Sequence, residues 1–532
     1  MTPIGEWGHY MRKPVLWIVV LVVVVAGAAG GYYGWTRLHD YAGEQFRTGL
    51  DQWIKTLPAG YSMTYKTAEY DVAADKATLG GVALKGAGAQ ALDVTLDQVE
   101  VSKPSIDFSA AWAQASANPA ALAPDKALPV AGTISVKGVS LHFATGSATV
   151  GSVRFDGLRL YPWALLHAGV PSWTEAQATL ATRAQPPQLE DLLPLLRFEA
   201  SIMLGIGYDS YAVDDMQVTA KVPATPQMPA TDVSYAIRKF SGSGYDRGTR
   251  GNAQAEGATI QAAPIGTITL ERVSMADMKF QQPLSQLLAG DPLTPEMLDG
   301  LEIGRIEYAG MQAKTPDGKE IPVGTLSISK IGFSHGVTIS GELSYAGLKL
   351  SKALMPDPRA QEAFDKLGLD TLTLSLGLSY QWDLDQKRMT VRDVALKIDE
   401  LGALNLSADL SDMTPGPGWQ THGSLAHALL RYDDASLTDR ALKAAALQTN
   451  TDAAALRQQV VAMVDARVTA LGNSPAIAAV AAAVKTFLGA PHSLTIELAP
   501  PAPVAFSELQ AAATMQPGDI AALVGLAVSA NK

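Results

Sequence analysis

Apolar residues recur at every second position over long stretches of the chain, which is the pattern of strands that bury one face. The clearest run has seven alternate apolar positions: Leu372, Leu374, Leu376, Leu378, Tyr380, Trp382 and Leu384. After a polar break, the alternation resumes at Leu404, Leu406 and Leu410. Because antiparallel sheets with one buried face alternate in this way, residues 58–415 are expected to form an elongated, mostly antiparallel body.

A short repeated pattern supports this expectation. Each copy begins with glycine, alternates apolar and polar residues, shifts phase by one position and then alternates again. The five copies begin at Gly132 (GTISVKGVSL), Gly151 (GSVRFDGLRL), Gly266 (GTITLERVSM), Gly304 (GRIEYAGMQA) and Gly324 (GTLSISKIGF). Glycine occupies the shift at Gly138, Gly157 and Gly310. Since glycine at a phase shift is typical of a β-bulge, the repeats predict strands with a bulge in each copy.

Two distant segments share a second pattern. Residues 70–85 (YDVAADKATLGGVALK) and 382–397 (WDLDQKRMTVRDVALK) align without a gap and match at six positions, among them Asp71 with Asp383. Each segment predicts a hairpin of strand, polar turn and strand. Helices are predicted at 187–197, 283–301 and 358–367, where they would cover a face or an end of the sheet. Loops are predicted at 222–231 and 242–251.

The composition becomes alanine-rich in the next segment, residues 416–490, and predicts three short helices. Ser436 is suited to cap the first helix and Thr451 the second, because their hydroxyls can accept from free backbone N–H groups. Ser474 followed by Pro475 is typical of the start of a third helix. This segment is therefore expected to be a small helical bundle.

The tail, residues 491–532, returns to strands at 494–498 and 526–529, with a proline-rich link and short helices between them. The predicted fold class is therefore α+β. It comprises an N-terminal transmembrane helix, an elongated and mostly antiparallel sheet of repeated strands with covering helices, and the C-terminal helical segment.

The N-terminus predicts where the protein resides. Residues 14–36 contain no charge from Pro14 to Trp35, which is enough to cross a bilayer as one helix. Arg12 and Lys13 precede this run, and a positive flank stays in the cytoplasm. We therefore expect a cytoplasmic tip at 1–13, a membrane anchor at 14–36 and the bulk of the chain outside the cytoplasm.

An alternative remains open, because Ala26-Gly27-Ala28 fits the small-x-small rule of signal-peptide cleavage. Cleavage there would leave a soluble exported protein. Beyond the anchor, residues 37–57 predict an amphipathic helix whose apolar face comprises Phe46, Leu50, Trp53, Ile54 and Leu57. This face would lie either along the membrane or against the folded domain.

Composition and charge narrow the classes of function. The chain has 532 residues, of which 47% are hydrophobic and 17% are charged, and this excludes a disordered polypeptide. The net charge of -11 does not provide the basic face of a nucleic-acid binder, so no nucleic-acid partner is expected. Without cysteine, disulfides, thiolate catalysis, iron–sulfur clusters and zinc fingers are excluded.

One motif resembles a catalytic signature. Residues 332–336 (GFSHG) fit the G-x-S-x-G pattern, in which a sharp strand-to-helix turn exposes the serine hydroxyl. The following residues, 337–345, alternate like a strand instead. Ser334 and His335 are therefore expected in a hairpin turn, and we do not predict an enzyme.

The remaining polar candidates do not form a predicted site. His422 and His427 lie five residues apart, which does not place them on one helical face, and HExxH is absent from the sequence. Asp214-Asp215 would point to opposite faces of a strand, and Asp433-Asp434 would favour the N-terminus of the helix that follows. We therefore predict no catalytic, cofactor-binding or metal-binding residue.

The order of these features resembles that of AsmA-like and YdgA-like single-anchor proteins of the Gram-negative envelope. The resemblance covers the layout of residues 1–410: a short tip, an anchor, an amphipathic helix, an early hairpin at 70–85 and many short strands. It implies long β-sheets with an apolar groove that move or organise lipids between membranes. It also implies that the anchor at 14–36 lies in the inner membrane with the bulk of the chain in the periplasm, or, after cleavage, that the protein is soluble in the periplasm. The helical segment at 416–490 departs from this layout.

Two functions are consistent with this reading. The first is lipid handling or envelope organisation through an apolar sheet groove, which would show as a continuous row of exposed apolar residues. The second is a structural or assembly role in which the helical segment binds another envelope protein. The sequence alone leaves the ligand, the partner and the oligomeric state open.

Overall fold

A computed structural model describes most of the chain. The described residues are 42–55, 57, 60–86, 93–105, 107–143, 146–167, 170–171, 189–222, 230–262, 266–292, 294–355, 357–415, 422–470 and 474–532. The predicted tip and anchor, residues 1–36, lie outside them, as does most of the predicted loop at 222–231. Within the described residues, no helix combines the length and apolar character needed to cross a membrane.

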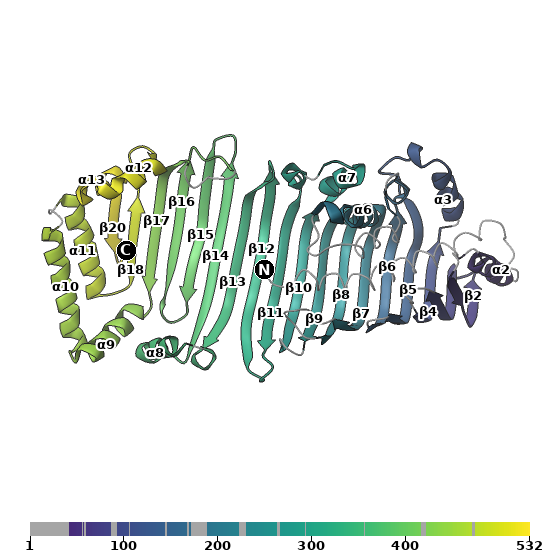
Figure 1. Ribbon diagram of the computed structural model, residues 1–532, viewed down its shortest axis with the longest axis horizontal. Helices are drawn as coiled ribbons and strands as arrows, with labels where there is room; N and C mark the ends of the chain where they lie inside the picture. Colours follow the sequence, from purple (N-terminus) through teal and green to yellow (C-terminus); the bar gives the residue numbers. More distant parts are fainter. Residues whose placement is uncertain are drawn as a thin grey trace. The chain divides into compact units, whose positions relative to one another are not determined.

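Twenty strands belong to one mostly antiparallel sheet, accompanied by helices (Figure 1), which confirms that part of the predicted fold class. The chain divides into two compact units. Unit 1 comprises Met1–Tyr308 and Ala313–Glu320, and unit 2 comprises Ala309–Gln312 and Ile321–Lys532. The units are described in turn.

In unit 1, each strand from β3 to β10 pairs with the next, while β1 and β2 both pair with β3. Most of the following strand, β11, also belongs to this unit. The strands are β1 Tyr61–Thr64, β2 Thr67–Asp71, β3 Lys76–Gly86, β4 Asp93–Pro104, β5 Leu128–Phe143, β6 Gly146–Leu160, β7 Ile206–Val222, β8 Thr231–Asp246, β9 Thr249–Ala262, β10 Gly266–Lys279 and β11 Glu302–Lys314. The helices are α2 Ala42–Ile54, α3 Phe108–Ala117, α4 Pro162–Leu165, α6 Leu189–Gly205 and α7 Gln281–Ala289, with 3-10 turns η2 Pro119–Ala121 and η3 Pro295–Leu298.

The predicted hairpin at 70–85 is confirmed. Strands β2 and β3 pair from Thr67 with Gly80 to Asp71 with Lys76. The Asp71 carboxylate accepts from the backbone N–H groups of Ala73 and Ala74, at 2.9 and 3.0 Å. This side chain therefore stabilises the polar turn that the sequence places there.

The phase shifts at Gly138 and Gly157 are present in unit 1, but they do not change the strand register at these two positions. In β5, the buried Val136 is followed by the buried Val139, with Gly138 between them at φ 60°. Across the sheet, Val139 still faces Leu96 on β4. The register is kept because β4 shifts phase at the same level, so no residue becomes extra. The prediction of a register-changing bulge at Gly138 is therefore wrong.

The shift positions align in two rows across the strands of unit 1. In the first row, the left-handed residues lie on alternate strands: Gly81 on β3, Gly138 on β5, Asp215 on β7 and Gly257 on β9. In the second row they lie on the strands between: Lys103 on β4, Gly157 on β6, Gly244 on β8 and Asp277 on β10. The aspartate of a neighbouring strand fills the space beside two of the glycines, because a Cβ on Gly138 would overlap the Asp97 carboxylate and one on Gly157 that of Asp209.

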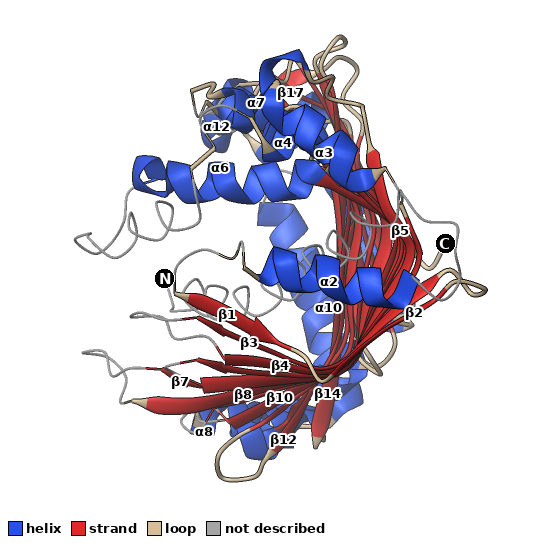
Figure 2. Cartoon of the chain, turned by 90° about the vertical axis from the view of Figure 1, so that its right-hand side faces the viewer, coloured by secondary structure: helices blue, strands red, loops and turns tan. Residues whose placement is uncertain are grey.

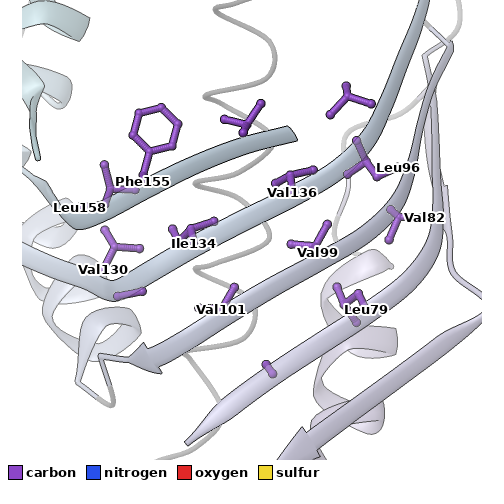
Figure 3. Close-up of a cluster of buried hydrophobic side chains, with 14 of the residues drawn as sticks. Leu79, Val82, Leu96, Val99, Val101, Val130, Ile134, Val136, Phe155 and Leu158 are labelled. Atoms are coloured by element: carbon purple, nitrogen blue, oxygen red, sulfur yellow. The ribbon is translucent and has the colours of Figure 1, made fainter. Parts of the chain in front are cut away.

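The inner side of this unit holds a large hydrophobic core. Figure 2 shows the strands bending along their length, with α2 on the inner side of the bend. Buried side chains on both sides of the shifts point into this core, among them Leu96, Val99 and Val136 (Figure 3). Phe46 and Leu50 of α2 are buried among them. The amphipathic helix therefore packs against the folded domain.

Two predictions in unit 1 are wrong in detail. The expected loop at 242–251 is mostly strand, and only residues 247–248 form a turn between β8 and β9. Gly242 in this segment allows the Tyr211 ring to pack closely against the backbone, since a Cβ there would lie 2.6 Å from the ring. The helix expected at 283–301 ends at Ala289, because Gly290 adopts φ 88° and stops it. The helix expected at 187–197 is α6, which continues to Gly205.

In unit 2 the order of neighbouring strands is β12-β13-β14-β15-β16-β17-β18-β20, with β19 also paired to β17. The strands are β12 Glu320–Ser334, β13 Val337–Ser351, β14 Thr371–Asp383, β15 Arg388–Ile398, β16 Gly402–Ser411, β17 Ser424–Asp434, β18 Ser493–Leu498, β19 Val504–Ala505 and β20 Leu526–Ala530. The helices are α8 Pro358–Leu367, α9 Leu437–Thr449, α10 Ala453–Ala470, α11 Pro475–Gly489, α12 Phe506–Ala511 and α13 Pro517–Leu523, with 3-10 turns η4 Lys352–Leu354 and η6 Ala512–Thr514.

Bulges that change the register do occur in unit 2. The register between β12 and β13 shifts between Ser329 and Gly332, where Lys330 has φ 54°. Lys330 holds the same place in its repeat as Gly138, so the predicted bulge is confirmed in the Gly324 copy. A second shift surrounds Asp393, also at φ 54°, in the confirmed hairpin of β14 and β15.

The predicted helical segment begins later than expected, because residues 424–434 form strand β17. Alternate residues Leu430 and Tyr432 face Leu406 and Leu404 of β16, so apolar cross-strand pairs override the alanine-rich composition. The helix at 358–367 is confirmed as α8, and the strands expected in the tail are confirmed as β18 and β20.

The caps of the C-terminal helices differ in part from those predicted. The Ser436 hydroxyl does not cap α9, and the Asp434 carboxylate accepts from the Thr438 N–H instead, at 2.9 Å. Asp452, not Thr451, accepts from the first N–H groups of α10. The cap by Ser474 is confirmed, since its hydroxyl accepts from the Ile477 N–H.

Candidate functional site: an apolar sheet surface

The serine of the hydrolase-like motif lies in a tight turn. Strand β12 ends at Ser334 and β13 begins at Val337, which confirms the predicted hairpin. His335 and Gly336 both have positive φ, at 51° and 70°. The Ser334 hydroxyl lies 3.0 Å from Nδ1 of His335, and both side chains are exposed. Since a strand follows the turn, the motif does not have the strand-to-helix setting of a nucleophile elbow.

The other polar candidates make contacts between neighbouring strands or adopt the special backbone conformations of the sheet. Asp214 accepts from the Ser152 hydroxyl on the neighbouring strand at 2.7 Å, while Asp215 adopts the left-handed conformation of the first row. His427 Nε2 lies 3.1 Å from a carboxylate oxygen of Glu497. In the part of the chain that the structure describes, no group of three or more His, Asp or Glu side chains could hold a metal ion.

One face of the unit 2 sheet is apolar across eight strands. Residues directly opposite in an antiparallel sheet point to the same face. Two adjacent rows of such residues run from β12 to β17 and on to β20, and the register shift between β14 and β15 interrupts the pairing of the second row between Leu378 and Val394. We call the residues of these rows from β12 to β17 the apolar floor: Leu326, Tyr345, Leu376, Leu396, Leu404 and Tyr432 in one row, and Ile328, Leu343, Leu378, Val394, Leu406 and Leu430 in the other.

The middle of the apolar floor is open to solvent. Its six leucines on β13 to β16 are 37–42% exposed: Leu343, Leu376, Leu378, Leu396, Leu404 and Leu406. Such fractions are expected for a sheet face that nothing covers, whereas Leu141 and Val136 in the core of unit 1 are 1% exposed. Figure 1 shows no helix drawn across these four strands. A contiguous exposed apolar surface of this kind is typical of a binding site.

Polar and small residues occupy the opposite face of the same strands. The row Ser327, Ser344, Gly377, Ala395, Asn405, Arg431 and Thr495 runs beside the floor with its side chains pointing the other way. Glu342 on this face accepts from Lys330 at 2.6 Å and from Ser329 at 3.0 Å. The Lys330 ammonium keeps the pKa of Glu342 below its ordinary value, so this face carries charge while the floor does not.

Two hydrophobic clusters close the floor at the two ends of the strands. At one end, Phe364 of α8 packs with Leu372, Ile398 and Leu401. At the other end, Trp382 and Met413 pack with Phe506 of α12 and its neighbours. The open strip of the floor therefore runs across the strands, between these two closed margins.

Helix α11 lies over the C-terminal end of the sheet. It contacts β18 and β20, and its buried side chains include Ala481, Ala483 and Phe487. The Phe487 ring meets the Tyr432 ring edge-on, with centroids 5.9 Å apart. The Tyr432 hydroxyl donates to Asp434 at 2.6 Å, and burial together with this bond raises the pKa of Tyr432, so the phenol is neutral.

The inner face of unit 1 is apolar too, but it is filled. Its aromatic cluster joins β6, β7 and β8 through Phe155, Tyr208, Tyr211 and Tyr245, all of them buried. Burial raises the pKa of Tyr211 and of Tyr245, and the Tyr245 hydroxyl donates to the Met203 carbonyl of α6 at 2.8 Å. Of these two apolar sheet faces, the floor of unit 2 is therefore the accessible one.

The alternation at 372–384 indicates which residues lie on the floor, but not that the floor is uncovered. A buried sheet face and an open one produce the same alternation, because both need apolar side chains at every second position. Leucines lie directly opposite each other in the pairs Leu376–Leu396 and Leu396–Leu404. These pairs would have indicated a continuous apolar surface, but they can be recognised only when the strand register is known.

The C-terminal part of the chain is similar to one protein family. A family model described as "Uncharacterized protein" matches residues 395–531, which run from the end of β15 to β20 and include α9, α10 and α11. No curated protein matches the chain. The structure and this match together establish a mostly antiparallel sheet whose C-terminal part is similar to that family.

Proposed function

We propose that the chain is a non-catalytic, membrane-anchored periplasmic protein that holds lipid acyl chains on the apolar floor of unit 2. The observation that carries this proposal is the set of six exposed leucines, which all point to one face of four neighbouring strands. Burying them against hydrocarbon removes apolar surface from water, which is favourable in proportion to the area removed.

The chemistry of the floor favours hydrocarbon over a peptide. A peptide would bring backbone N–H and C=O groups that need partners when they are buried. The floor offers only aliphatic groups and the Tyr345 and Tyr432 rings, and those two hydroxyls already donate, to the Val323 carbonyl and to Asp434. An acyl chain has no polar group to satisfy, so its burial there carries no such cost.

The predicted anchor at 14–36 and the AsmA-like layout are part of this proposal. An anchor would keep the floor close to a membrane, from which acyl chains could be drawn. The resemblance to AsmA-like and YdgA-like envelope proteins supports the same class of ligand. Localisation in the inner membrane, with the bulk of the chain in the periplasm, remains a proposal on these grounds.

A second candidate function is docking of another envelope protein on the C-terminal helices. Leu447 of α9 is 83% exposed and Met463 of α10 is 62% exposed. Exposed apolar side chains on neighbouring helices are typical of helix-mediated contacts. In this case the helices, and not the floor, would carry the specific contacts.

In-cell photocrosslinking tests the proposal on the full chain. A benzophenone amino acid replaces Leu376 on the floor or, as a matched control, its neighbour Ser375, which points to the opposite face. After irradiation, we expect lipid adducts on the peptide that contains position 376 and none at position 375. Equal adducts at both positions, or none at either, would contradict lipid binding on the floor.

The same experiment addresses the second candidate. A benzophenone at Leu447 should yield no stoichiometric protein adduct if the helices serve only unit 2 itself. A single protein partner captured at Leu447, with no lipid captured at Leu376, would replace lipid handling by assembly as the function of the chain.

A further inference from the structure

Helix α11 lies at one end of the apolar floor, a position that the predicted docking role does not require. Helix α11 lies on the same face of the sheet as the apolar floor, since its Phe487 contacts Tyr432, the last residue of one floor row. Beyond Tyr432 the row continues to Leu494 and Ala530, where α11 contacts the strands. The helix therefore ends the open part of the floor.

The geometry leaves one direction for an extended ligand. The clusters around Phe364 and around Trp382 close the two ends of the strands. An extended ligand on the floor must therefore lie across the strands, and α11 blocks its path at β17. Neighbouring strands are about 4.8 Å apart, so the distance from β12 to β16 is roughly 19 Å.

This length matches one acyl chain. The hydrocarbon core of a bilayer is about 30 Å thick and contains two leaflets, so the chains of one leaflet extend roughly 15 Å. The part of the floor from β12 to β16 is thus long enough for a single extended chain. We propose that the Phe487–Tyr432 pair is a stop that receives the methyl end of this chain and limits the length that unit 2 accepts.

The inference rests on the proposed function, because a stop has meaning only if acyl chains lie on the floor. It adds a specificity-determining residue, Phe487, and a class of ligand that is defined by chain length. The aromatic edge suits this role, since Phe487 is 8% exposed and the Tyr432 hydroxyl is held away by Asp434. A terminal methyl group would meet only ring carbons there.

Length selectivity can be measured on the full chain. The protein is purified in a bile-salt detergent, which has no alkyl tail, and equilibrated with an equimolar mixture of saturated fatty acids of graded length. The bound acids are identified by mass spectrometry. We expect the wild type to bind acids up to a limiting length and to discriminate against longer ones.

Two variants then locate the stop. Phe487→Ala removes the ring and lets about two further methylene groups be buried, so the bound ratio of longer to limiting acid should rise about tenfold. Leu376→Trp places bulk on the open strip and should shorten the limiting length. Leu447→Trp, at an exposed position away from the floor, is the matched control and should leave the distribution unchanged.

The outcomes distinguish between failure of the proposed function and failure of the stop. A wild type that binds no acid contradicts the proposed function, and the stop with it. A wild type that binds acids of all lengths equally, or a folded Phe487→Ala variant with an unchanged distribution, overturns the stop and leaves the proposed function standing. Should Phe487→Ala fail to fold, Phe487→Leu and Leu376→Trp decide in its place, because the first keeps an apolar contact and the second changes an exposed position.

Discussion

Leu376 on β14 and Leu396 on β15 face each other directly across the sheet, and both are exposed, at 42% and 37%. Cross-strand leucine pairs commonly serve a core, where burial stabilises the fold. This pair stabilises the fold only partly, because one side of each leucine is exposed to solvent. The sequence therefore keeps apolar side chains at positions where the folded chain, by itself, gains little from them.

The first prediction compares the floor with the core. Leu376→Ala should lower the free energy of unfolding by less than about 1 kcal/mol, since little surface becomes newly exposed. Leu141→Ala, at a position that is 1% exposed, should cost about 2–5 kcal/mol because it leaves a cavity. Denaturant unfolding of both variants provides the comparison. Equal costs would show that something covers the floor in solution.

The second prediction concerns the left-handed row of unit 1. Gly138→Ala should destabilise the fold by about 1–2 kcal/mol, because φ is 60° there and the new Cβ would displace the Asp97 carboxylate. Asp97→Ala in the same chain should recover part of the loss, which a double-mutant cycle would measure. Gly132→Ala, whose φ is not in the left-handed range, is the control, and an equal loss there would refute the role of the conformation.

The third prediction concerns the cap of α10. Asp452→Ala removes the carboxylate that accepts from Ala454 and Ala455, at 2.9 and 3.2 Å. Loss of such a cap costs about 1 kcal/mol. Thr451→Ala should change the stability much less, because the Thr451 hydroxyl donates only to an exposed carbonyl at Thr449. Thermal unfolding followed by circular dichroism tests the order of the two variants, and the reverse order would restore Thr451 as the cap.

The fourth prediction is a pH dependence of stability. The Arg154 guanidinium, with Thr133 and Ser210, lowers the pKa of Asp156 below its ordinary value of 3.8. A carboxylate with a lowered pKa contributes stability that is fully present above its unfolded pKa and is lost as the pH falls through its folded pKa. Asp156→Asn should therefore be less stable than the wild type at neutral pH, and the difference should shrink below about pH 4. A difference that does not depend on pH would contradict this assignment.

The sequence predicted the strands because local alternation reflects which face of a strand is apolar. The run at 372–384 corresponds to β14, Thr371–Asp383, and the two similar segments correspond to hairpins. The same alternation could not predict that Leu376 is exposed, because exposure depends on whether another element covers the face. Only the tertiary arrangement decides that.

Some bulges and caps escaped prediction for a related reason, whereas the bulge at Lys330 and the cap by Ser474 were predicted. Gly138 and Lys330 hold the same place in the repeat, yet only the second lies at a register shift. The difference depends on whether the partner strand shifts at the same level, and the partner is not encoded in the repeat itself. Ser436 was predicted as the cap of α9, but Asp434 caps the helix instead, which confirms the expected role of the Asp433-Asp434 pair at this N-terminus. Strand β17 ends beside the helix, and the sequence had predicted that strand as part of the helical segment.

The alternating left-handed rows of unit 1 have a consequence for how such a sheet can change in length. At Gly138 on β5, in one row, and at Gly157 on β6, in the other, the register is kept because the neighbouring strand shifts at the same level. A single added strand would place two left-handed positions, or none, side by side. The smallest segment that can be duplicated or deleted without disturbing the rest is therefore a pair of strands, so we expect relatives of this chain to differ in unit 1 by whole hairpins.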